Sequence, residues 1–590
     1  MTKAVVAHQA GITALRDAYL SGTLTPTDLV ERLADGPPGV WIDRVTPDKL
    51  RHRAAELEKT TPEDLPLYGV PFAVKDNIDV AGMPTTAACP AFAYTPQRSA
   101  PVVDKLLAAG AILVGKTNLD QFATGLTGSR SPYGAVESVF GGGLIAGGSS
   151  SGSAVAVAAG LVSFALGTDT AGSGRVPAAL NGVVGLKPTR GLISTAGVVP
   201  ACRSLDCVSV FALDVTDAAT VLAVARGPVT DDPWSRSEPA AVPRAARTLG
   251  VARPEALDFE GDRGQAERYV EGCLALARHT SSVEPVGRDG LAALLEAGAL
   301  LYEGPWVAER LADLEEFLTA PEHADAVLPL TRGIIEGGRR FTAADAFRAQ
   351  HRLKGLQAAT ARLFERIDVL ALPTIPTTYT LDEIAAEPLR RNAVLGRYTQ
   401  FANLLDLAVV TVPNGRTPDG RPASLSLIGP AFSEPMLLGL AAEFLGEAST
   451  AGDPHKDTVE LAVVGHHLRD EPRNGELVAL GGRFVRTTRT EGCYRLFRLP
   501  GGTDGLPGLV RVANGGVPIE VELWRLPSAA LGALLTSVPA PLSIGFVSIV
   551  DEPGTKVPGF LCEAYAAAGG QDISAGGGWR AFRALQEEGQ

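Results

Sequence analysis

The chain has 590 residues, of which 45% are hydrophobic and 20% are charged, a balance typical of folded proteins and not of disordered chains. This length exceeds what one hydrophobic core usually supports, so we expect two or three domains. The net charge of −13 disfavours nucleic acid and anionic membranes as partners.

Cysteine usage points to a reducing compartment. The six cysteines lack the spacing of a metal site or of a CxxC unit, so we expect free thiols and a cytoplasmic protein. The first ten residues lack the apolar core of a secretory signal. We predict no metal and no cofactor.

The N-terminal part alternates between helical and strand patterns. A helix is predicted to open at Ser99, with a serine cap and an early proline, and to end at Gly110. The apolar run 111–115 then predicts a buried strand. A helix over 153–159 and a strand over 161–166 repeat this unit, which favours an α/β core.

Residues 138–168 carry no formal charge and are numerous enough to span a bilayer. Glycine and serine crowd the first half, and Gly160 interrupts the second. We interpret this stretch as a loop, a buried helix and a buried strand, and we predict no membrane partner.

The second half begins with a mostly helical region. Residues 258–361 predict a helical layer or lid, and strand patterns return at 369–373 and 408–413. The small and polar residues 446–458 predict a linker. We therefore expect a first domain over 1–445 and a separate small α/β domain over 459–590, which closes with a helix near 579–588.

Three segments carry residues suited to chemistry. Lys75 ends the apolar run of Gly69–Asn77, where burial would lower its pKa and make it a base. Ser149 lies in the glycine- and serine-rich segment 147–153. Ser173 follows a predicted strand and a glycine-containing turn, which can expose a hydroxyl and direct backbone N–H groups at one point. Taken singly, a solvated lysine and two ordinary serine turns explain them equally well.

Together these segments closely resemble the amidase signature family, densely over Leu65–Leu213 and more loosely over the rest of the first 445 residues. Ser149 and Ser173 are 24 residues apart, as the two catalytic serines of that family are. The resemblance implies a mixed central sheet covered by helices. It also implies that Ser173 is the nucleophile, that Ser149, preceded by a cis peptide bond, shuttles the proton, and that Lys75 is the terminal base.

The resemblance further implies an oxyanion hole made by the N–H groups of Thr170, Ala171, Gly172 and Ser173. This sequence departs from the family at Ser151 and Ala171, where glycine is more frequent, but both residues are small. Sequence distance does not exclude a Ser-His-Asp triad. However, no histidine lies near the serine motifs, and no Gly-x-Ser-x-Gly elbow competes with them.

Two segments resemble the allophanate hydrolase subgroup, Asn118–Gly134, which contains Gly125, and Tyr302–Arg310. In that subgroup, a tyrosine and an arginine with this spacing hold the substrate carboxylate. We expect Tyr302 and Arg310 on one face of a single helix, although Pro305 would interrupt it. On pattern alone, an ion pair of Arg310 with Glu303 or Glu309 on the surface is the alternative.

The region after Val459 resembles the C-terminal domain of allophanate hydrolases, in its segments at 464–468, 494–501 and 576–581. The resemblance implies a small α/β domain like the gamma-glutamylcyclotransferase-like fold. His467 corresponds to a histidine implicated in helping the hydrolysis product lose carbon dioxide. A structural histidine in a turn is an equal alternative.

We therefore predict an amidohydrolase acting on linear amides, namely an allophanate hydrolase, with a substrate that carries an amide and a carboxylate, and a homodimeric state. The alternatives are a general small-amide amidase and the glutaminase subunit of a tRNA-dependent amidotransferase. A membrane fatty-acid amidase is disfavoured because no N-terminal membrane helix is predicted. An inactive amidase-fold scaffold is disfavoured because Lys75, Ser149 and Ser173 are all present.

Overall fold

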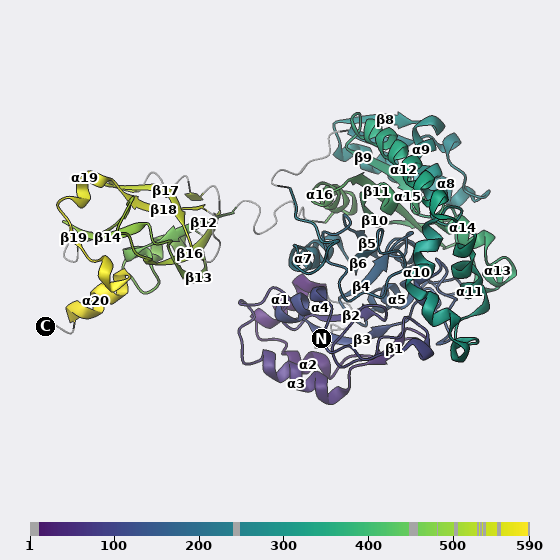
Figure 1. The fold of residues 1–590 in the computed structure, drawn as a ribbon, viewed down its shortest axis with the longest axis horizontal. Coiled ribbons are helices and arrows are strands. Elements are labelled where there is room, and N and C mark those ends of the chain that lie inside the picture. Colours follow the sequence, from purple (N-terminus) through teal and green to yellow (C-terminus); the bar gives the residue numbers. More distant parts are fainter. Residues whose placement is uncertain are drawn as a thin grey trace, which may run out of the picture. The chain divides into compact units, whose positions relative to one another are not determined.

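The computed structural model describes residues 11–239, 248–447, 458–480, 482–500, 505–527, 530–531, 534, 538–550 and 556–587. The chain divides into two compact units, Met1–Thr450 and Ala451–Gln590 (Figure 1). The predicted linker over 446–458 falls largely on 448–457, which lie outside the described residues.

The N-terminal unit is built on a mixed sheet, with eleven strands among the described residues. Strand β2 runs parallel to both β3 and β4, and β7 runs parallel to both β8 and β9, whereas the other pairs are antiparallel. The order across the sheet is β1 (Trp41–Arg44), β3 (Ile112–Thr117), β2 (Pro71–Lys75), β4 (Phe164–Asp169), β6 (Cys207–Ala212), β5 (Val184–Lys187), β10 (Leu407–Arg416), β11 (Pro422–Pro430), β9 (Val369–Pro373), β7 (Thr248–Ala252) and β8 (Ser282–Val286).

Helices cover both faces of this sheet. Because side chains alternate along a strand, Phe164 and Leu166 of β4 join the apolar cluster that includes α4 and α7, whereas Ala165 joins the cluster around α5. The helices are α1 (Ile12–Leu20), α2 (Pro26–Val30), α3 (Pro47–Leu57), α4 (Pro101–Ala108), α5 (Ser151–Ala158), α6 (Val176–Asn181), α7 (Val215–Ala225), α8 (Arg263–Leu276), α9 (Arg288–Ala299), α10 (Trp306–Thr319), α11 (Pro329–Glu336), α12 (Ala343–Phe364), α13 (Leu381–Ala386), α14 (Arg390–Gly396), α15 (Phe401–Leu404) and α16 (Glu434–Leu445).

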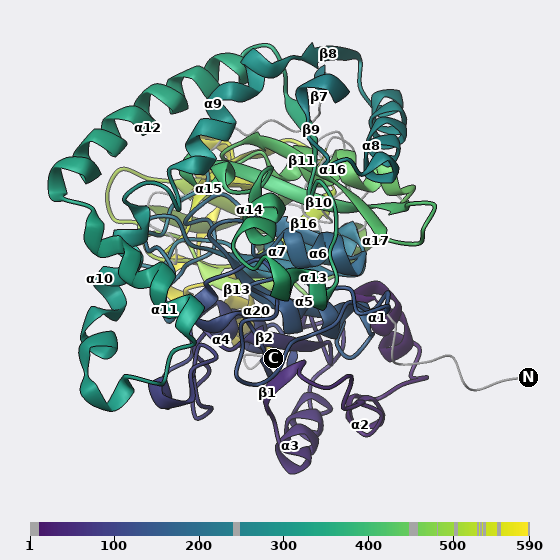
Figure 2. The same cartoon turned by 90° about the vertical axis from the view of Figure 1, so that its right-hand side faces the viewer.

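The predicted helical layer is present in the second half of this unit. Figure 2 shows the long helix α12 beside α9, with α10 and α11 continuing the layer. The uncharged stretch at 138–168 is a loop followed by buried α5 and buried β4, as predicted. No helix among the described residues is long and apolar enough to cross a membrane.

The C-terminal unit is a small α/β domain, and the predicted mixed α/β class is confirmed for both units. The likeness of this domain to the gamma-glutamylcyclotransferase-like fold stays a prediction. Its five-stranded sheet has the order β13 (Arg483–Arg489), β16 (Glu520–Pro527), β12 (Thr458–Val463), β18 (Lys556–Cys562) and β17 (Leu542–Ser548). A second sheet contains β15 (Leu506–Arg511), β14 (Tyr494–Leu499) and β19 (Gln571–Asp572), and the described helices are α17 (Asn474–Ala479), α19 (Ala564–Ala567) and α20 (Trp579–Glu587).

The stack of Phe72 on Phe164 tests the core beneath β2 and β4. The two rings lie 5.2 Å apart and both side chains are fully buried. We expect Phe164→Ala to lower the free energy of unfolding by about 3–5 kcal/mol, because it leaves a cavity. Urea denaturation of the full chain measures this, with the exposed Phe347→Ala as control. Equal effects of the two changes would contradict the assigned packing.

Candidate active site

Lys75 is the last residue of β2, and its side chain is fully buried. Its Nζ lies 2.8 Å from Ser149 Oγ and 2.7 Å from Thr168 Oγ1. Burial lowers the pKa of Lys75 to about 7, although the carboxylates of Asp120, Asp169 and Asp206 act in the opposite direction. A substantial share of this amine is therefore neutral near neutral pH, as a base requires.

Ser149 lies in the loop that leads into α5, and the Gly148–Ser149 peptide bond is cis. Asp120 fixes this loop from the other side. Its backbone N–H donates to the Ser149 carbonyl at 3.0 Å, and its Oδ2 would lie 2.0 Å from a Cβ at position 148. Only glycine therefore fits before Ser149.

Ser173 lies in a buried loop between β4 and α6, held by an ion pair of Asp169 with Arg175. Arg175 donates from Nε and from one terminal nitrogen to the two oxygens of Asp169, each at 2.9 Å. Burial acts to raise the pKa of Asp169, but Arg175 outweighs it and the net shift is downward. The carboxylate therefore stays charged and fixes the loop around Ser173.

One group of the predicted oxyanion hole is already engaged. The Gly172 N–H donates to Asp169 Oδ1 at 3.0 Å, so we correct the expectation that it faces the reacting carbonyl. Gly172 is needed for a different reason. Its φ is +130°, and a Cβ there would lie 2.3 Å from Thr399 Oγ1. The N–H groups of Thr170, Ala171 and Ser173 remain the candidates for the oxyanion hole.

Tyr302 and Arg310 do not share a helix, which corrects a second expectation. Helix α9 ends at Ala299 and α10 begins only at Trp306, with Pro305 as its N-cap, so Tyr302 lies in the turn between them. The two side chains still meet, because the Arg310 guanidinium lies 5.7 Å from the centre of the Tyr302 ring.

Arg310 is buried, and the proposed surface ion pair with Glu303 or Glu309 is not formed. The Arg310 side chain is 2% exposed and donates to Thr124 Oγ1 at 2.5 Å, whereas Glu309 accepts hydrogen bonds from Ser204. A buried guanidinium with this arrangement can bind a carboxylate in a water-poor site.

Gly125 follows Thr124 and lies against Asp120. Its φ is +157°, and a Cβ there would lie 2.7 Å from Asp120 Oδ2. The same carboxylate accepts the N–H groups of Thr127, Gly128 and Arg130 at 2.8–3.2 Å. One buried aspartate thus shapes the predicted substrate segment and also contacts the Ser149 loop.

The sequence analysis missed Thr168, Asp120, Thr124 and Asp206. Thr168 is the contact of Lys75, and its position in the strand register beside Lys75 could have indicated it. Asp206 accepts from the Thr170 hydroxyl and from the Ala201 and Cys202 N–H groups, and burial raises its pKa to about 6. Nothing local in the sequence marks these residues, because their partners are distant in the chain.

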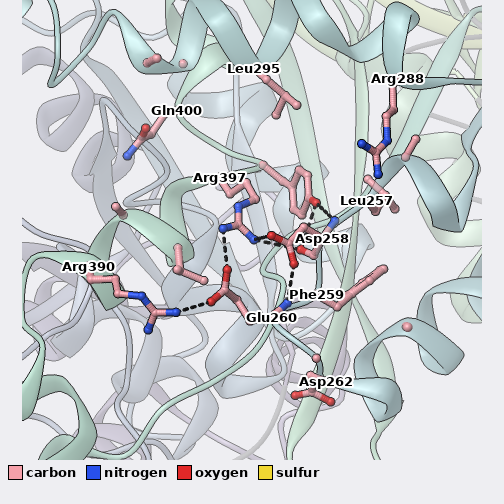
Figure 3. Close-up of a pocket in the computed structure, with 18 of the residues that line it drawn as sticks. Leu257, Asp258, Phe259, Glu260, Asp262, Arg288, Leu295, Arg390, Arg397 and Gln400 are labelled. Carbon is pink, nitrogen blue, oxygen red and sulfur yellow. Dashed lines mark hydrogen bonds and ion pairs between the residues drawn. The ribbon is translucent and has the colours of Figure 1, made fainter.

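A separate pocket of about 1180 Å³ lies between 256–266, α9 and 390–400, and Lys75, Ser149 and Ser173 do not line it. Figure 3 shows Arg397 between Asp258 and Glu260, at 2.9 and 2.6 Å, with Arg390 also on Glu260 at 2.8 Å. Its acidic and basic groups thus largely pair with each other. We therefore place the candidate active site at the buried lysine and serines.

His467 lies in the C-terminal unit and is 6% exposed. Its ring stacks on Phe560 with centroids 4.7 Å apart, and its Nε2 lies 3.3 Å from a Glu476 oxygen. Burial lowers the pKa of His467, although Glu476 acts in the opposite direction. Among the described residues, no group of three or more His, Cys, Asp or Glu side chains could hold a metal ion.

Comparison with known proteins identifies the family. Residues 28–438 match the amidase family, and residues 459–584 match the allophanate hydrolase C-terminal domain. The chain therefore belongs to the amidase family. The predicted family with its C-terminal domain is confirmed, and it supports the expected class of enzyme, an amidohydrolase.

Three relatives show how far the similarity extends. The chain is 40% identical to urea amidolyase of Saccharomyces cerevisiae, over 97% of this chain but 32% of that protein. It is similar to a Kluyveromyces lactis allophanate hydrolase structure, with 39% identity, a TM-score of 0.71, and coverage of 98% of this chain and 100% of the other. One polypeptide of the glutamyl-tRNA(Gln) amidotransferase of Natronomonas pharaonis is 35% identical over 66% of this chain and 98% of its own length. The chain thus spans about a third of the curated urea amidolyases it matches.

The buried pair of Asp169 and Arg175 gives a test of the scaffold. Arg175→Met should destabilise the protein by about 3–5 kcal/mol, because it leaves the Asp169 charge buried without a partner. Urea denaturation of the full chain measures this. Arg352→Met, which breaks an exposed pair with Glu296, should have a far smaller effect. A comparable loss in both variants would refute the assigned role of Asp169.

Proposed function

We propose that this protein hydrolyses allophanate (urea-1-carboxylate) at its terminal amide. The observation that carries the proposal is the contact of the buried Lys75 amine with Ser149 Oγ, in the same site region as the buried Arg310. The matches to the amidase family and to the allophanate hydrolase C-terminal domain support the same choice.

In the proposed relay, neutral Lys75 accepts the proton of Ser149 while Ser149 accepts that of Ser173. The Ser173 oxygen then attacks the terminal amide carbon, and the N–H groups of Thr170, Ala171 and Ser173 stabilise the charge that develops on oxygen. The proton returns along the relay to the leaving ammonia. Water then cleaves the acyl-enzyme and yields an N-carboxycarbamate.

In this proposal, Arg310 binds the carboxylate of the substrate. Its planar fork can donate two parallel hydrogen bonds, Thr124 holds one of its nitrogens, and Tyr302 lies beside it. Gly125 leaves room for the substrate where a side chain would meet Asp120. The pair of anchor and nucleophile therefore selects a short amide that ends in a carboxylate.

We place the second step in the C-terminal domain, over 459–590. There the N-carboxycarbamate loses carbon dioxide, so that allophanate yields ammonia and carbon dioxide in total. His467 is the candidate residue, since its lowered pKa keeps the imidazole neutral near pH 7. The domain limits of 1–445 and 459–590, the cytoplasmic location and the homodimer remain predictions.

A glutaminase function is the second candidate, because the N-terminal unit is similar to a glutamyl-tRNA(Gln) amidotransferase polypeptide over nearly the whole length of that polypeptide. The match of 459–584 to the allophanate hydrolase C-terminal domain favours allophanate hydrolysis.

Ammonia release from allophanate by the purified full chain tests the function. Ser173→Ala should abolish it, and Lys75→Ala should cost nearly as much, because members of one relay are not additive. Arg310→Ala should raise the KM for allophanate about 10- to 100-fold, the worth of a hydrogen bond to a charged group. Arg348→Ala, on the exposed side of α12, is the control. Turnover of glutamine or of neutral amides in place of allophanate would transfer the assignment to the alternatives.

The pKa of Lys75 predicts the pH profile. Only the neutral amine acts as a base, so kcat/KM should rise about tenfold per pH unit below the pKa and level off above it. The midpoint is expected near the Lys75 pKa of about 7. Initial rates between pH 5.5 and 9 measure this, with the exposed Lys354→Ala as a control that leaves the midpoint unchanged. A rising limb centred above pH 9 would show that Lys75 is not the base.

A further inference from the structure

A short turn, Cys202–Asp206, lies between the nucleophile loop and helix α10, and we refer to it as the 202–206 turn. On its outer side it contacts α10 at positions 306, 309 and 313, which lie on one face of the helix. The contacts are Cys202 Sγ to the Trp306 carbonyl (3.2 Å), Ser204 N and Oγ to Glu309 (2.8 and 2.7 Å), and Arg203 Nε to Asp313 (2.8 Å).

The Glu309 contact is the most specific of these. One carboxylate oxygen accepts the Ser204 N–H and the other accepts the Ser204 hydroxyl, so the carboxylate is held in one orientation. Glu309 directly precedes Arg310. Any shift of α10 that breaks this contact therefore also moves the guanidinium.

On its inner side, the 202–206 turn reaches the nucleophile loop. Asp206 accepts the hydroxyl of Thr170, three residues before Ser173, and its two oxygens also accept the N–H groups of Ala201 and Cys202. Asp206 is 6% exposed and Cys202 is 1% exposed, so water does not compete readily for these bonds. The turn thus joins the loop of Ser173 to the helix of Arg310.

Hydrophobic packing alone fixes α10 less closely. Leu311, Leu314 and Leu318 pack into an apolar cluster with Phe122, which keeps the helix folded and attached. Apolar contacts are not directional, so they permit small shifts of the helix along its axis. The polar contacts of the 202–206 turn are directional and set its height.

We propose that Glu309 is a positioning residue that sets, through Ser204 and the 202–206 turn, the distance between the carboxylate anchor Arg310 and the nucleophile Ser173. This inference rests on the proposed function and adds a specificity determinant to it. The fixed distance selects substrates by the spacing between their carboxylate and their scissile amide, because a small misplacement of bound groups sharply lowers the rate.

Glu309→Ala tests the proposal through two substrates, allophanate and its neutral counterpart biuret. We expect the KM for allophanate to rise about tenfold, equivalent to one charged hydrogen bond, with biuret turnover within about twofold of wild type. Glu316→Ala, at an exposed glutamate of the same helix, is the matched control and should change neither. An equal loss on both substrates, or no loss on either, would overturn the proposal.

A double-mutant cycle separates positioning from general damage. If Glu309 acts through Arg310, Glu309→Ala should not raise KM further when Arg310 is already alanine, whereas independent effects would add. Circular dichroism melting verifies folding. Should Glu309→Ala fail to fold, Ser204→Ala removes only the hydroxyl contact and should raise the KM for allophanate about threefold, again with biuret unchanged.

The proposed function and this inference fail separately. If the wild type does not hydrolyse allophanate, the proposed function is wrong, and the same variants are then compared on malonamate and its neutral counterpart malonamide. A selective loss on malonamate would still support the role of Glu309. Equal values for the two variants and the wild type on both compounds would refute it.

Discussion

The removal of Lys75 from water is the constraint on which the rest of the site depends. A fully buried ammonium is costly, and burial is the largest influence on its pKa. Three carboxylates would restore the charge if they were unbalanced. Each is instead occupied by other donors: Asp169 by Arg175, Asp206 by Thr170 and two N–H groups, and Asp120 by three N–H groups. Their engagement leaves the amine close to neutrality at physiological pH.

The sheet delivers these groups to one edge. Because β2 and β4 are parallel and pair with Val74 opposite Leu166, Lys75 ends its strand beside the segment that continues to Thr168 and Asp169. Strand β6 runs antiparallel on the other side, with Cys207 opposite Asp169, so the 202–206 turn enters at the same edge. Backbone pairing alone therefore assembles the base, the aspartate scaffold and the turn that reaches α10, before any side-chain contact is considered.

The sequence predicts local elements well where the determinants are local. The strand over 369–373 has the expected bounds, and the helix expected from Ser99 begins at Pro101, because the Ser99 hydroxyl accepts from Ala81 and does not cap the helix. Pro305 and the turn before it separate Tyr302 from α10, which periodicity did not resolve. Gly172 was assigned to the oxyanion hole, although its N–H binds Asp169. Such contacts depend on how distant segments fold together, so no single stretch of sequence encodes them.

Chemistry and selection are thus carried by different layers of the N-terminal unit. The relay lies at the edge of the sheet, where backbone register fixes it, whereas the carboxylate anchor lies on a helix of the covering layer. A helix packed by apolar contacts can change its side chains or shift without disturbing the strands beneath it. The cost of this separation is that the two layers need a directional link, since an anchor at the wrong height would hold the substrate carboxylate while its amide missed Ser173. The 202–206 turn is such a link, because it is bonded to the nucleophile loop on one side and to α10 on the other.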